Sequence, residues 1–292
     1  MTALDRFGPA TKEWFTSAFK AATPAQTGAW DAIGTGGHAL VIAPTGSGKT
    51  LAAFLSALDR LTTTPRPKEV EHRCRVVYVS PLKALAVDVE RNLRSPLTGI
   101  RRAAQLIGEA EVAAAEVVIA MRTGDTPAEA RRAFARSAAD ILITTPESLY
   151  LLLTSQARDV LQGVDTVIVD EVHALAGTKR GAHLAVTLER LDARLSRPAQ
   201  RIGLSATIRP VEEVATFLAG GRGVTVVQPP ADKTIAVEVV VPVEDMSEPG
   251  TDTSSIWPAV DERIADLIAT HRSTIVFANS RRLAERLTTR LN

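Results

Sequence analysis

Residues 41–51, Val-Ile-Ala-Pro-Thr-Gly-Ser-Gly-Lys-Thr-Leu, decide the fold of this chain. An apolar strand end runs into a glycine-containing turn and then into a helix start, the order that a phosphate-binding loop requires. Gly46 and Gly48 let backbone N–H groups turn toward phosphate oxygens where a side chain would block the approach, and the helix N-terminus adds partial positive charge. The stretch therefore predicts a nucleotide site at the end of a strand.

The same loop predicts how ATP is held. Lys49 is expected to reach the β- and γ-phosphates, and the hydroxyl of Thr50 is expected to bind Mg²⁺. The alternative is a glycine-rich turn without a ligand, which the preceding strand and the placement of Lys-Thr disfavour. The predicted cofactor-binding residues of the loop are Thr45, Gly46, Ser47, Gly48, Lys49 and Thr50.

A second apolar run ends in two carboxylates. Residues 166–173, Thr-Val-Ile-Val-Asp-Glu-Val-His, place Asp170 and Glu171 at the carboxyl end of a predicted strand, where open α/β sheets bind ligands. Asp170 is predicted to hold Mg²⁺ through its water shell, and Glu171 to orient and deprotonate the attacking water. His173 is predicted to link this catalytic site to a neighbouring loop, with a purely structural histidine as the alternative.

Short apolar runs alternate with helical patterns along most of the chain. The runs are too continuous to have one wet face, which is typical of parallel strands covered by helices on both sides. We therefore predict an α/β fold with a doubly wound parallel sheet. The predicted strands are 38–43, 75–80, 116–121, 140–144, 166–170 and 201–204, and the clearest helices are 49–61, 126–136 and 181–195.

The pattern changes after Leu218, where glycines and prolines flank residues 224–227. We interpret this stretch as a linker between a first unit, residues 1–228, and a second unit, residues 229–292. The second unit is predicted to be the truncated start of another doubly wound domain. Its predicted elements are strands at 235–241 and 274–277, an acidic loop at 244–255, and helices near 259–270 and from Ser280.

The composition excludes several classes of protein. Hydrophobic residues make up 45% and charged residues 23% of the 292 residues, as in a globular chain. The net charge of +1 means that any nucleic acid must bind through local groups. Cys74, the single cysteine, is expected to be buried and suits a reducing compartment. Because no apolar run reaches the length of a membrane span, we predict a cytoplasmic protein without a membrane partner.

Residues 170–173, Asp-Glu-Val-His, resemble the DExH box of superfamily 2 helicases, and the phosphate loop has the form found there, with Ala43 in place of the usual first glycine. Gln26 resembles the glutamine that recognises adenine in these proteins. Ser205 and Thr207 resemble the residues that couple hydrolysis to domain movement, although both could instead cap a helix. The resemblance implies a RecA-like P-loop NTPase domain, followed by the incomplete start of a second RecA-like domain.

Three further stretches resemble motifs that contact a nucleic-acid strand: residues 80–85, 122–125 and 144–148. In the first, Lys83 and free N–H groups at a helix start can meet phosphates, although a plain strand-to-helix turn is the alternative. The third could equally form a helix N-cap. The contact residues implied by the resemblance are Pro81, Lys83, Thr123, Gly124, Thr144, Thr145 and Pro146.

Residues 179–184 and 189–191 narrow the resemblance to the Lhr family, the large helicase-related proteins of bacteria and archaea, and residues 275–281 resemble a motif of the second motor domain. The family implies an ATP-dependent helicase that moves 3′ to 5′ on single-stranded DNA. It also implies displacement of paired strands, RNA:DNA hybrids among them, in DNA repair. The implied partner is therefore single-stranded DNA or RNA, and no oligomeric state is predicted.

The motifs that would supply arginines from a second motor domain do not occur before Asn292. Such arginines contribute ~10³–10⁵-fold in rate, so we expect this chain alone to be a weak ATPase that does not unwind strands. Three alternatives stay open: an RNA helicase of the exosome-associated type, an ATP- and nucleic-acid-binding module without turnover, and a P-loop ATPase that acts on proteins. The intact catalytic residues argue against the second, and Gln26 with residues 80–85 against the third.

Overall fold

The computed structural model describes residues 2–206, 208–230, 236–243 and 256–291. The chain divides into two compact units, Met1–Ala231 and Asp232–Asn292. Three parts of the sequence-based predictions lie outside the described residues: Thr207, Ile235 and the acidic loop at 244–255.

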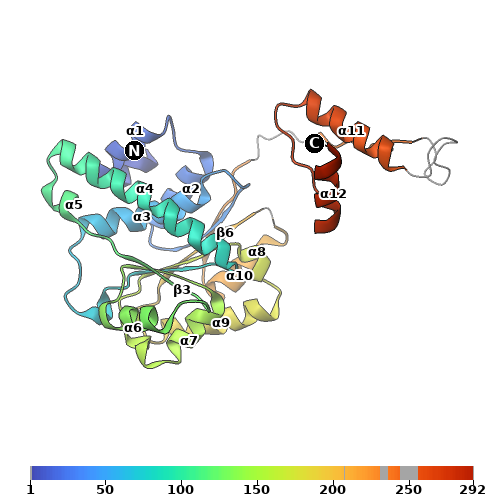
Figure 1. The fold of residues 1–292 in the computed structure, drawn as a ribbon. Helices are drawn as coiled ribbons and strands as arrows, with labels where there is room; N and C mark the ends of the chain where they lie inside the picture. The colour runs from blue at the N-terminus through green and yellow to red at the C-terminus, as the bar shows by residue number, and fades with distance from the viewer. Residues whose placement is uncertain (1, 207, 231–235, 244–255, 292) are drawn as a thin grey trace. The chain divides into compact units, whose positions relative to one another are not determined.

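A seven-stranded parallel sheet forms the centre of the first unit, in the spatial order β3-β4-β2-β5-β6-β1-β7 (Figure 1). The first six strands overlap the six predicted runs, which confirms the doubly wound α/β fold. The strands are β1 (His38–Ile42), β2 (Val76–Val79), β3 (Ile119–Arg122), β4 (Ile141–Thr144), β5 (Thr166–Val169), β6 (Gln200–Ser205) and β7 (Val224–Val227).

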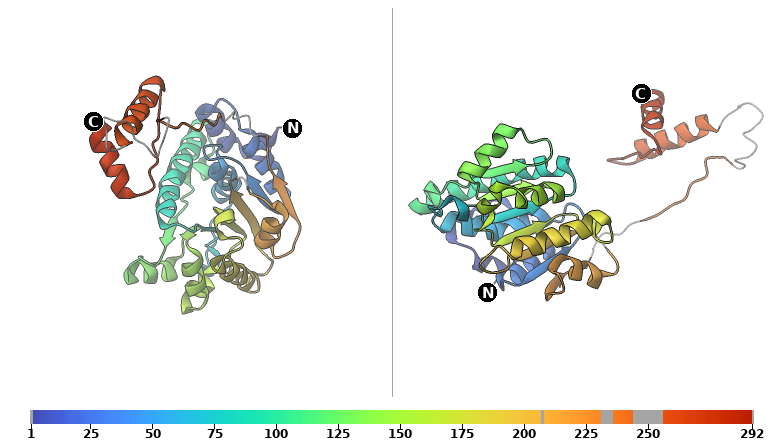
Figure 2. Two further views of the ribbon diagram at one scale, coloured as in Figure 1. Left: turned by 90° about the vertical axis from the view of Figure 1, so that its right-hand side faces the viewer. Right: turned by 90° about the horizontal axis from the view of Figure 1, so that it is seen from below.

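Helices cover both faces of the sheet (Figures 1 and 2). One face packs under α1 (Pro9–Ala18), α2 (Pro24–Gly34), α3 (Lys49–Thr63), α4 (Lys83–Ile107) and α5 (Ala110–Ala114). The other face packs under α6 (Ala128–Ser137), α7 (Pro146–Leu153), α8 (Val172–Leu175), α9 (Lys179–Asp192) and α10 (Val211–Ala219). Short 3₁₀ helices span Ala3–Arg6 (η1), Val70–His72 (η2) and Gln156–Leu161 (η3).

Alternation along the strands explains why both faces are apolar. Val41 lies in the core under α1 to α5, and its neighbour Ile42 lies in the core under α6 to α10. Trp30 is fully buried in the first core and meets the rings of Phe7 and Phe15 edge-on, each with centroids 5.2 Å apart. Burying a large apolar side chain contributes ~1.5–3 kcal/mol, so these two cores provide the main driving force for folding of the unit.

The sheet register brings the predicted motifs to one edge. Ile42 pairs with Ser205, and Val79 pairs with both Val169 and Thr144. The carboxyl ends of β1, β6, β5, β2 and β4 therefore form a row in which neighbouring strands are ~4.8 Å apart. The loops that leave this row are the ones that the sequence singles out for ATP and nucleic acid.

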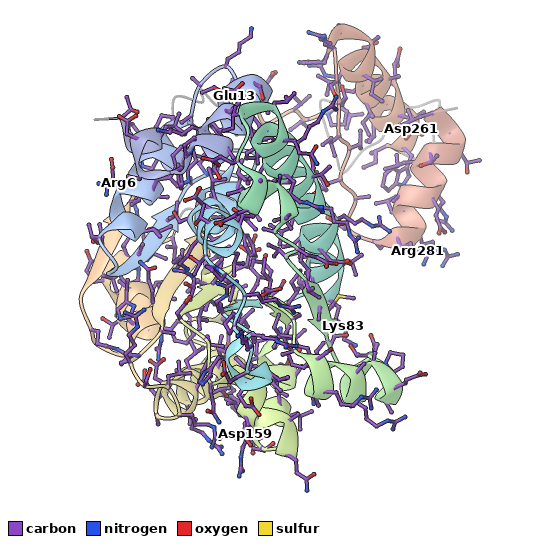
Figure 3. The ribbon with its side chains drawn as sticks, turned by 90° about the vertical axis from the view of Figure 1, so that its left-hand side faces the viewer. Arg6, Glu13, Lys83, Asp159, Asp261 and Arg281 are labelled. Carbon is purple, nitrogen blue, oxygen red and sulfur yellow. The ribbon has the colours of Figure 1, made fainter. Side chains whose placement is uncertain are left out.

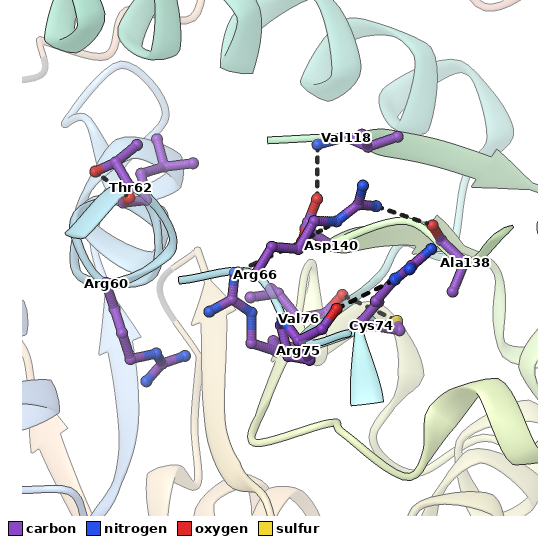
Figure 4. Close-up of polar contacts among 12 residues, drawn as sticks. Arg60, Thr62, Arg66, Cys74, Arg75, Val76, Val118, Ala138 and Asp140 are labelled. Atoms are coloured by element: carbon purple, nitrogen blue, oxygen red, sulfur yellow. Dashed lines mark hydrogen bonds and ion pairs between the residues drawn. The ribbon is translucent and has the colours of Figure 1, made fainter. Parts of the chain in front are cut away.

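The opposite edge of the sheet contains a buried ion cluster around Asp140 (Figure 4). Asp140 is 1% exposed; it accepts from Arg66 Nε at 3.2 Å and from the Val118 N–H at 2.8 Å, and forms an ion pair with Arg75 at 3.5 Å. Arg66 also donates to the Ala138 carbonyl at 3.2 Å. The cluster ties the amino ends of β2, β3 and β4 together.

Replacing Asp140 is expected to destabilise the fold strongly. In Asp140→Ala the guanidinium of Arg75 stays buried without its countercharge, so the free energy of unfolding should fall by ~3–5 kcal/mol. Asp31→Ala is a suitable control, because it removes an exposed ion pair with Arg6 at 3.1 Å and should cost ~1 kcal/mol or less. Chemical denaturation measures both changes; equal losses for the two variants would contradict a structural role for the cluster.

The segment interpreted from sequence as a linker contains a strand, so that interpretation is wrong for residues 224–227. These residues form β7, which pairs in parallel with β1 and ends the sheet. The free edge of β1 offers unpaired N–H and C=O groups, which an extended segment rich in valine can satisfy. The flanking glycines and prolines are typical of a linker, and for that reason the strand was not predicted.

In the second unit, the described residues form α11 (Trp257–Thr270) and α12 (Arg281–Leu291), as predicted. The strands predicted at 235–241 and 274–277 are not found in the described residues, and those two predictions are wrong there. A strand requires a neighbouring ladder, whereas Val239 and Phe277 are 88% and 89% exposed.

Two expectations about burial and membranes are also tested by the fold. Cys74 is fully buried, as predicted, and burial raises the pKa of its thiol. Within the described part of the chain, no helix combines the length and the apolar character needed to cross a membrane.

Candidate functional site

The phosphate-binding loop is an exposed turn that leads into the N-terminus of α3. Gly46 and Gly48 have φ values of +84° and +79°, a region that favours glycine. A Cβ on Gly48 would lie 2.5 Å from Gln26 Nε2, so a larger residue does not fit there. Ser47 closes the turn through its hydroxyl, which donates to the Pro44 carbonyl at 2.7 Å. Of the predicted cofactor residues, Thr45, Gly46, Ser47 and Gly48 form this turn, and Lys49 and Thr50 are the first two residues of α3.

The ammonium of Lys49 folds over this loop. Its Nζ donates to the carbonyl of Ala43 and, at 3.1 Å, to that of Pro44. Burial lowers the pKa of Lys49, while Glu171 and Asp170 oppose the shift by favouring the charged form. A half-buried ammonium whose hydrogen bonds go to neutral carbonyls gains most from an anionic partner, so the arrangement suits a phosphate.

Gln26, predicted to recognise adenine, lies against the phosphate loop. Its Oε1 accepts from the Thr23 N–H at 2.9 Å, and its own N–H donates to Thr23 Oγ1 at 3.2 Å, a reciprocal cap at the start of α2. The Thr23 hydroxyl also donates to the Ser47 carbonyl at 2.8 Å, which fastens α2 to the loop. The side-chain NH₂ of Gln26 therefore lies beside Gly48 of the phosphate loop.

Asp170 is 8% exposed at the end of β5, and both of its carboxylate oxygens are oriented by neighbours. Oδ1 accepts from the Glu171 N–H at 2.9 Å, and Oδ2 accepts from the hydroxyl of Tyr78 on β2. Burial and the charge of Asp170 raise the pKa of Tyr78, so this phenol remains a donor. Tyr78 thus fixes the carboxylate that the sequence assigns to Mg²⁺.

Asp170 and Glu171 form the turn that follows β5, here called the carboxylate turn. Glu171 and His173 form a chain of contacts from this turn to the loop after β6. The backbone of Glu171 is left-handed, with φ of +47°, which turns the chain sharply at the strand end. His173 Nε2 lies 3.1 Å from Glu171 Oε2, and the Ala206 N–H donates to His173 Nδ1 at 3.3 Å. Because Nδ1 is an acceptor, the geometry assigns the proton of the neutral ring to Nε2, facing Glu171.

Ser205 lies at the end of β6 and does not cap a helix. Its hydroxyl is 3.2 Å from His173 Nδ1, whereas the N-cap residue of α10 is Pro210. The helix-cap alternative is therefore wrong for Ser205.

At the carboxyl ends of β2, β4 and β3, on the same edge of the sheet, Lys83 connects two of the loops predicted to contact nucleic acid. It begins α4 (Figure 3), and its Nζ pairs with Asp125 at 2.6 Å; these side chains are 54% and 75% exposed. Gly124 lies beside it, since a Cβ there would be 3.7 Å from Lys83 Nζ. An exposed pair contributes ~0–1 kcal/mol, so a phosphate can replace Asp125 at little cost.

The loop after β4 combines a helix cap with an ordered strand end. Thr145 Oγ1 accepts from the Ser148 N–H at 3.4 Å, so the N-cap interpretation holds, and Pro146 takes the first position of α7. The Thr144 hydroxyl donates to the Arg122 carbonyl at 2.7 Å. Five predicted contact residues are buried: Pro81, Thr123, Thr144, Thr145 and Pro146.

Two residues shape these loops in ways that the sequence did not indicate: Tyr78, and Arg131, whose helical spacing with Arg132 and Arg136 favours a solvated helix face. Tyr78 lies in a continuous apolar run, where a tyrosine is expected to pack, and only the sheet register brings it beside Asp170. Arg131 donates to the carbonyls of Thr126 and Gly124, each at 2.8 Å, and so shapes the turn beside Lys83. No local signal distinguishes these residues from ordinary core and surface positions.

The donor set at the carboxylate turn suits Mg²⁺ bound together with a nucleotide. Within the described residues, no group of three or more His, Cys, Asp or Glu side chains is placed to hold a metal alone. Mg²⁺ commonly takes one or two carboxylates and completes its shell with water and phosphate oxygens. Asp170 at the end of β5 and the hydroxyl of Thr50 in the first turn of α3 are the oxygen donors that fit this requirement.

Comparisons with known proteins match most of the chain to helicases. Residues 23–214 match the family described as DEAD/DEAH box helicase. The chain is 54% identical over 304 aligned positions to "Lhr helicase/uracil glycosylase" of Escherichia coli, covering 99% of this chain and 20% of that protein. It is 42% identical over 278 positions to "ATP-dependent helicase Lhr-Core" of Methanocaldococcus jannaschii, covering 94% of this chain and 32% of that protein.

A solved structure shows the same similarity in three dimensions. "Structure of Mycobacterium smegmatis helicase Lhr bound to ssDNA and AMP-PNP" superposes with a TM-score of 0.85 and 61% identity, covering 100% of this chain and 36% of that chain. The chain spans between 19% and 32% of the length of the first three curated relatives that it matches.

Proposed function

Because the chain belongs to the DEAD/DEAH box helicase family, we propose that its first unit is the ATP-binding motor of an enzyme that works along a nucleic-acid strand. One observation carries the proposal: a single sheet edge holds the ATP motifs, on β1, β6 and β5, beside the nucleic-acid motifs, on β2, β4 and β3. Carboxyl ends of strands in open α/β sheets are where ligands bind, so both partners would meet one rigid surface.

The side chains of the carboxylate turn and the phosphate loop each have a separate role in ATP hydrolysis. Lys49 binds the β- and γ-phosphates, while Asp170 and Thr50 would hold Mg²⁺, which would supply positive charge beside the transferred phosphoryl group. Glu171 orients the attacking water and accepts its proton. His173, whose Nε2 faces Glu171, keeps that carboxylate directed at the water.

Two further sets of residues connect this chemistry to its ligands. Gln26 recognises adenine through the NH₂ group beside Gly48. Ser205 and Thr207 couple hydrolysis to domain movement, and the support for this is that Ser205 lies 3.2 Å from the His173 ring that in turn meets Glu171.

The likeness to Lhr helicases supports the finer assignment. We place the chain in an ATP-dependent helicase that moves 3′ to 5′ on single-stranded DNA and displaces paired strands, including RNA:DNA hybrids, during DNA repair in the cytoplasm. The exposed contacts come from Lys83 and Gly124, and the N-terminus of α4 offers its N–H groups to phosphates. An RNA helicase of the exosome-associated type is distinguished by comparing stimulation of ATP hydrolysis by single-stranded DNA and RNA.

Lys83→Ala tests the nucleic-acid surface. If Lys83 exchanges Asp125 for a phosphate, its loss should reduce the slope of log association constant against log salt by ~0.7 for single-stranded DNA. The measurement is a salt titration of the binding of labelled oligothymidylate by the full-length protein.

Lys68→Ala is the matched control for this titration. Lys68 is also an exposed lysine, but it follows α3 at the opposite edge of the sheet, so its loss should leave the slope unchanged. Equal slopes for Lys83→Ala and the unmodified protein would remove Lys83 from the proposed surface.

A further inference from the structure

Arg180 joins two of the loops on the nucleic-acid half of the sheet edge. Its Nε and Nη2 donate to the two carboxylate oxygens of Glu147, the second at 2.9 Å, and its Nη1 donates to the Pro81 carbonyl at 2.7 Å. Glu147 lies in the first turn of α7, and Pro81 directly precedes Leu82, the N-cap residue of α4. One guanidinium therefore spans the N-terminal ends of both helices.

The backbone at Arg180 is itself held firmly. The Thr178 hydroxyl accepts from the Gly181 N–H at 3.0 Å and donates to the Leu175 carbonyl at 2.7 Å, which fixes the start of α9 against the end of α8. A Cβ on Gly181 would lie 2.0 Å from the Leu175 carbonyl oxygen, so only glycine permits this close approach. The two residues of this Arg-Gly pair therefore have different roles. Gly181 allows the start of α9 to pack against the end of α8, and Arg180 extends from that fixed backbone toward Glu147 and Pro81.

The contact to Glu147 has the geometry of a strong ion pair. A planar guanidinium that meets both carboxylate oxygens gives more fixed geometry than a single charged contact. The hydrogen bond from Arg180 lowers the pKa of Glu147, which keeps this carboxylate charged. Because the pair neutralises its own charge, it is poorly suited to attract a phosphate directly.

We propose that Arg180 is a positioning residue that holds the N-termini of α4 and α7 at the separation at which both meet one nucleic-acid strand. The inference rests on the proposed function. Beyond the last backbone hydrogen bond between β2 and β4, from the Ser80 N–H to the Thr144 carbonyl at 2.9 Å, the clamp formed by Arg180, Glu147 and the Pro81 carbonyl joins the loops after these strands. Without it, Lys83 and the N–H groups of α4 no longer keep their position beside α7. Arg180 acts through these loops and does not touch the strand.

Removing Glu147 distinguishes the clamp from simple electrostatics. An isolated acidic group on a nucleic-acid surface repels the strand, so its loss would tighten binding. The clamp predicts the opposite result, weaker binding of the strand, because Glu147→Ala releases Arg180 and with it both loops. An Arg180 that bound a phosphate directly would also bind more tightly once freed from Glu147.

The experiment measures the affinity of the full-length protein for labelled oligothymidylate. Arg180→Ala and Glu147→Ala should each weaken binding about tenfold, a loss typical of one charged contact network. The double variant should lose no more than either single variant, because the two residues act as a unit. Arg180→Lys keeps the charge but cannot donate to both carboxylate oxygens of Glu147 at once, so its affinity should lie between those of Arg180→Ala and the unmodified protein.

Asp159→Ala and Arg194→Ala are the matched controls, since this pair meets at 2.7 Å with side chains 51% and 35% exposed, close to 53% and 38% for Glu147 and Arg180. Both controls should bind DNA like the unmodified protein, and all variants should bind an ATP analogue normally. Tighter or unchanged DNA binding by Glu147→Ala, or additive losses in the double variant, would overturn the clamp alone. An unmodified protein that binds no single strand would overturn the proposed function and the clamp with it.

Discussion

Glu171→Gln is expected to slow ATP hydrolysis by about 10²–10⁴-fold while ATP stays bound, because an amide has the size of the carboxylate but cannot accept the proton of the attacking water. His173 can still donate to the amide oxygen, so the turn should keep its shape. Rapid mixing of the full-length protein with labelled ATP, in the presence of single-stranded DNA, separates binding from turnover.

Glu13→Gln is the control for this experiment, since it removes an exposed carboxylate on α1, away from the strand ends (Figure 3). It should hydrolyse ATP at the normal rate. Normal turnover in Glu171→Gln would remove Glu171 from the role of general base.

Lys49→Ala is expected to weaken ATP binding by at least about 10- to 100-fold, because charged hydrogen bonds to phosphate contribute ~1.5–3 kcal/mol. The substitution should lower the affinity for ATP without lowering the stability of the fold. Since burial lowers the pKa of Lys49, the charged ammonium is disfavoured in the nucleotide-free site, and its removal should change the melting temperature little. Calorimetric titration with a non-hydrolysable ATP analogue measures the affinity.

Lys20→Ala provides the control for Lys49→Ala, since Lys20 is an exposed lysine just after α1. Its affinity for the analogue should equal that of the unmodified protein. An unchanged dissociation constant for Lys49→Ala would refute the assignment of the phosphate loop.

Features that depend on neighbouring residues in the sequence were predictable. The strands β1 to β6 follow from continuous apolar runs, and the phosphate loop follows from two glycines and Lys49 between a strand and a helix. Asp170 and Glu171 were predictable for the same reason, since both stand at the end of one strand. In each case a local pattern determines both the element and the direction in which the chain leaves it.

Features that depend on which strands become neighbours were not predictable. Tyr78 orients Asp170 only because β2 lies next to β5, and Arg180 meets Glu147 only because α9 starts beside the loop after β4. Residues 224–227, Val-Thr-Val-Val, have the β-branched side chains of a strand, but β7 pairs only because β1 has a free edge, and those residues do not show where that edge lies. These contacts link segments far apart in the sequence, so they require the topology of the sheet.

The dependence of ATP hydrolysis on nucleic acid tests the central claim most directly. The full-length protein should hydrolyse ATP slowly alone and faster as single-stranded DNA is added, up to a plateau, and this increase should disappear in Lys49→Ala. Hydrolysis at one rate with and without single-stranded DNA or RNA would contradict the account, because the ATP motifs and the nucleic-acid motifs on the shared sheet edge would then work independently.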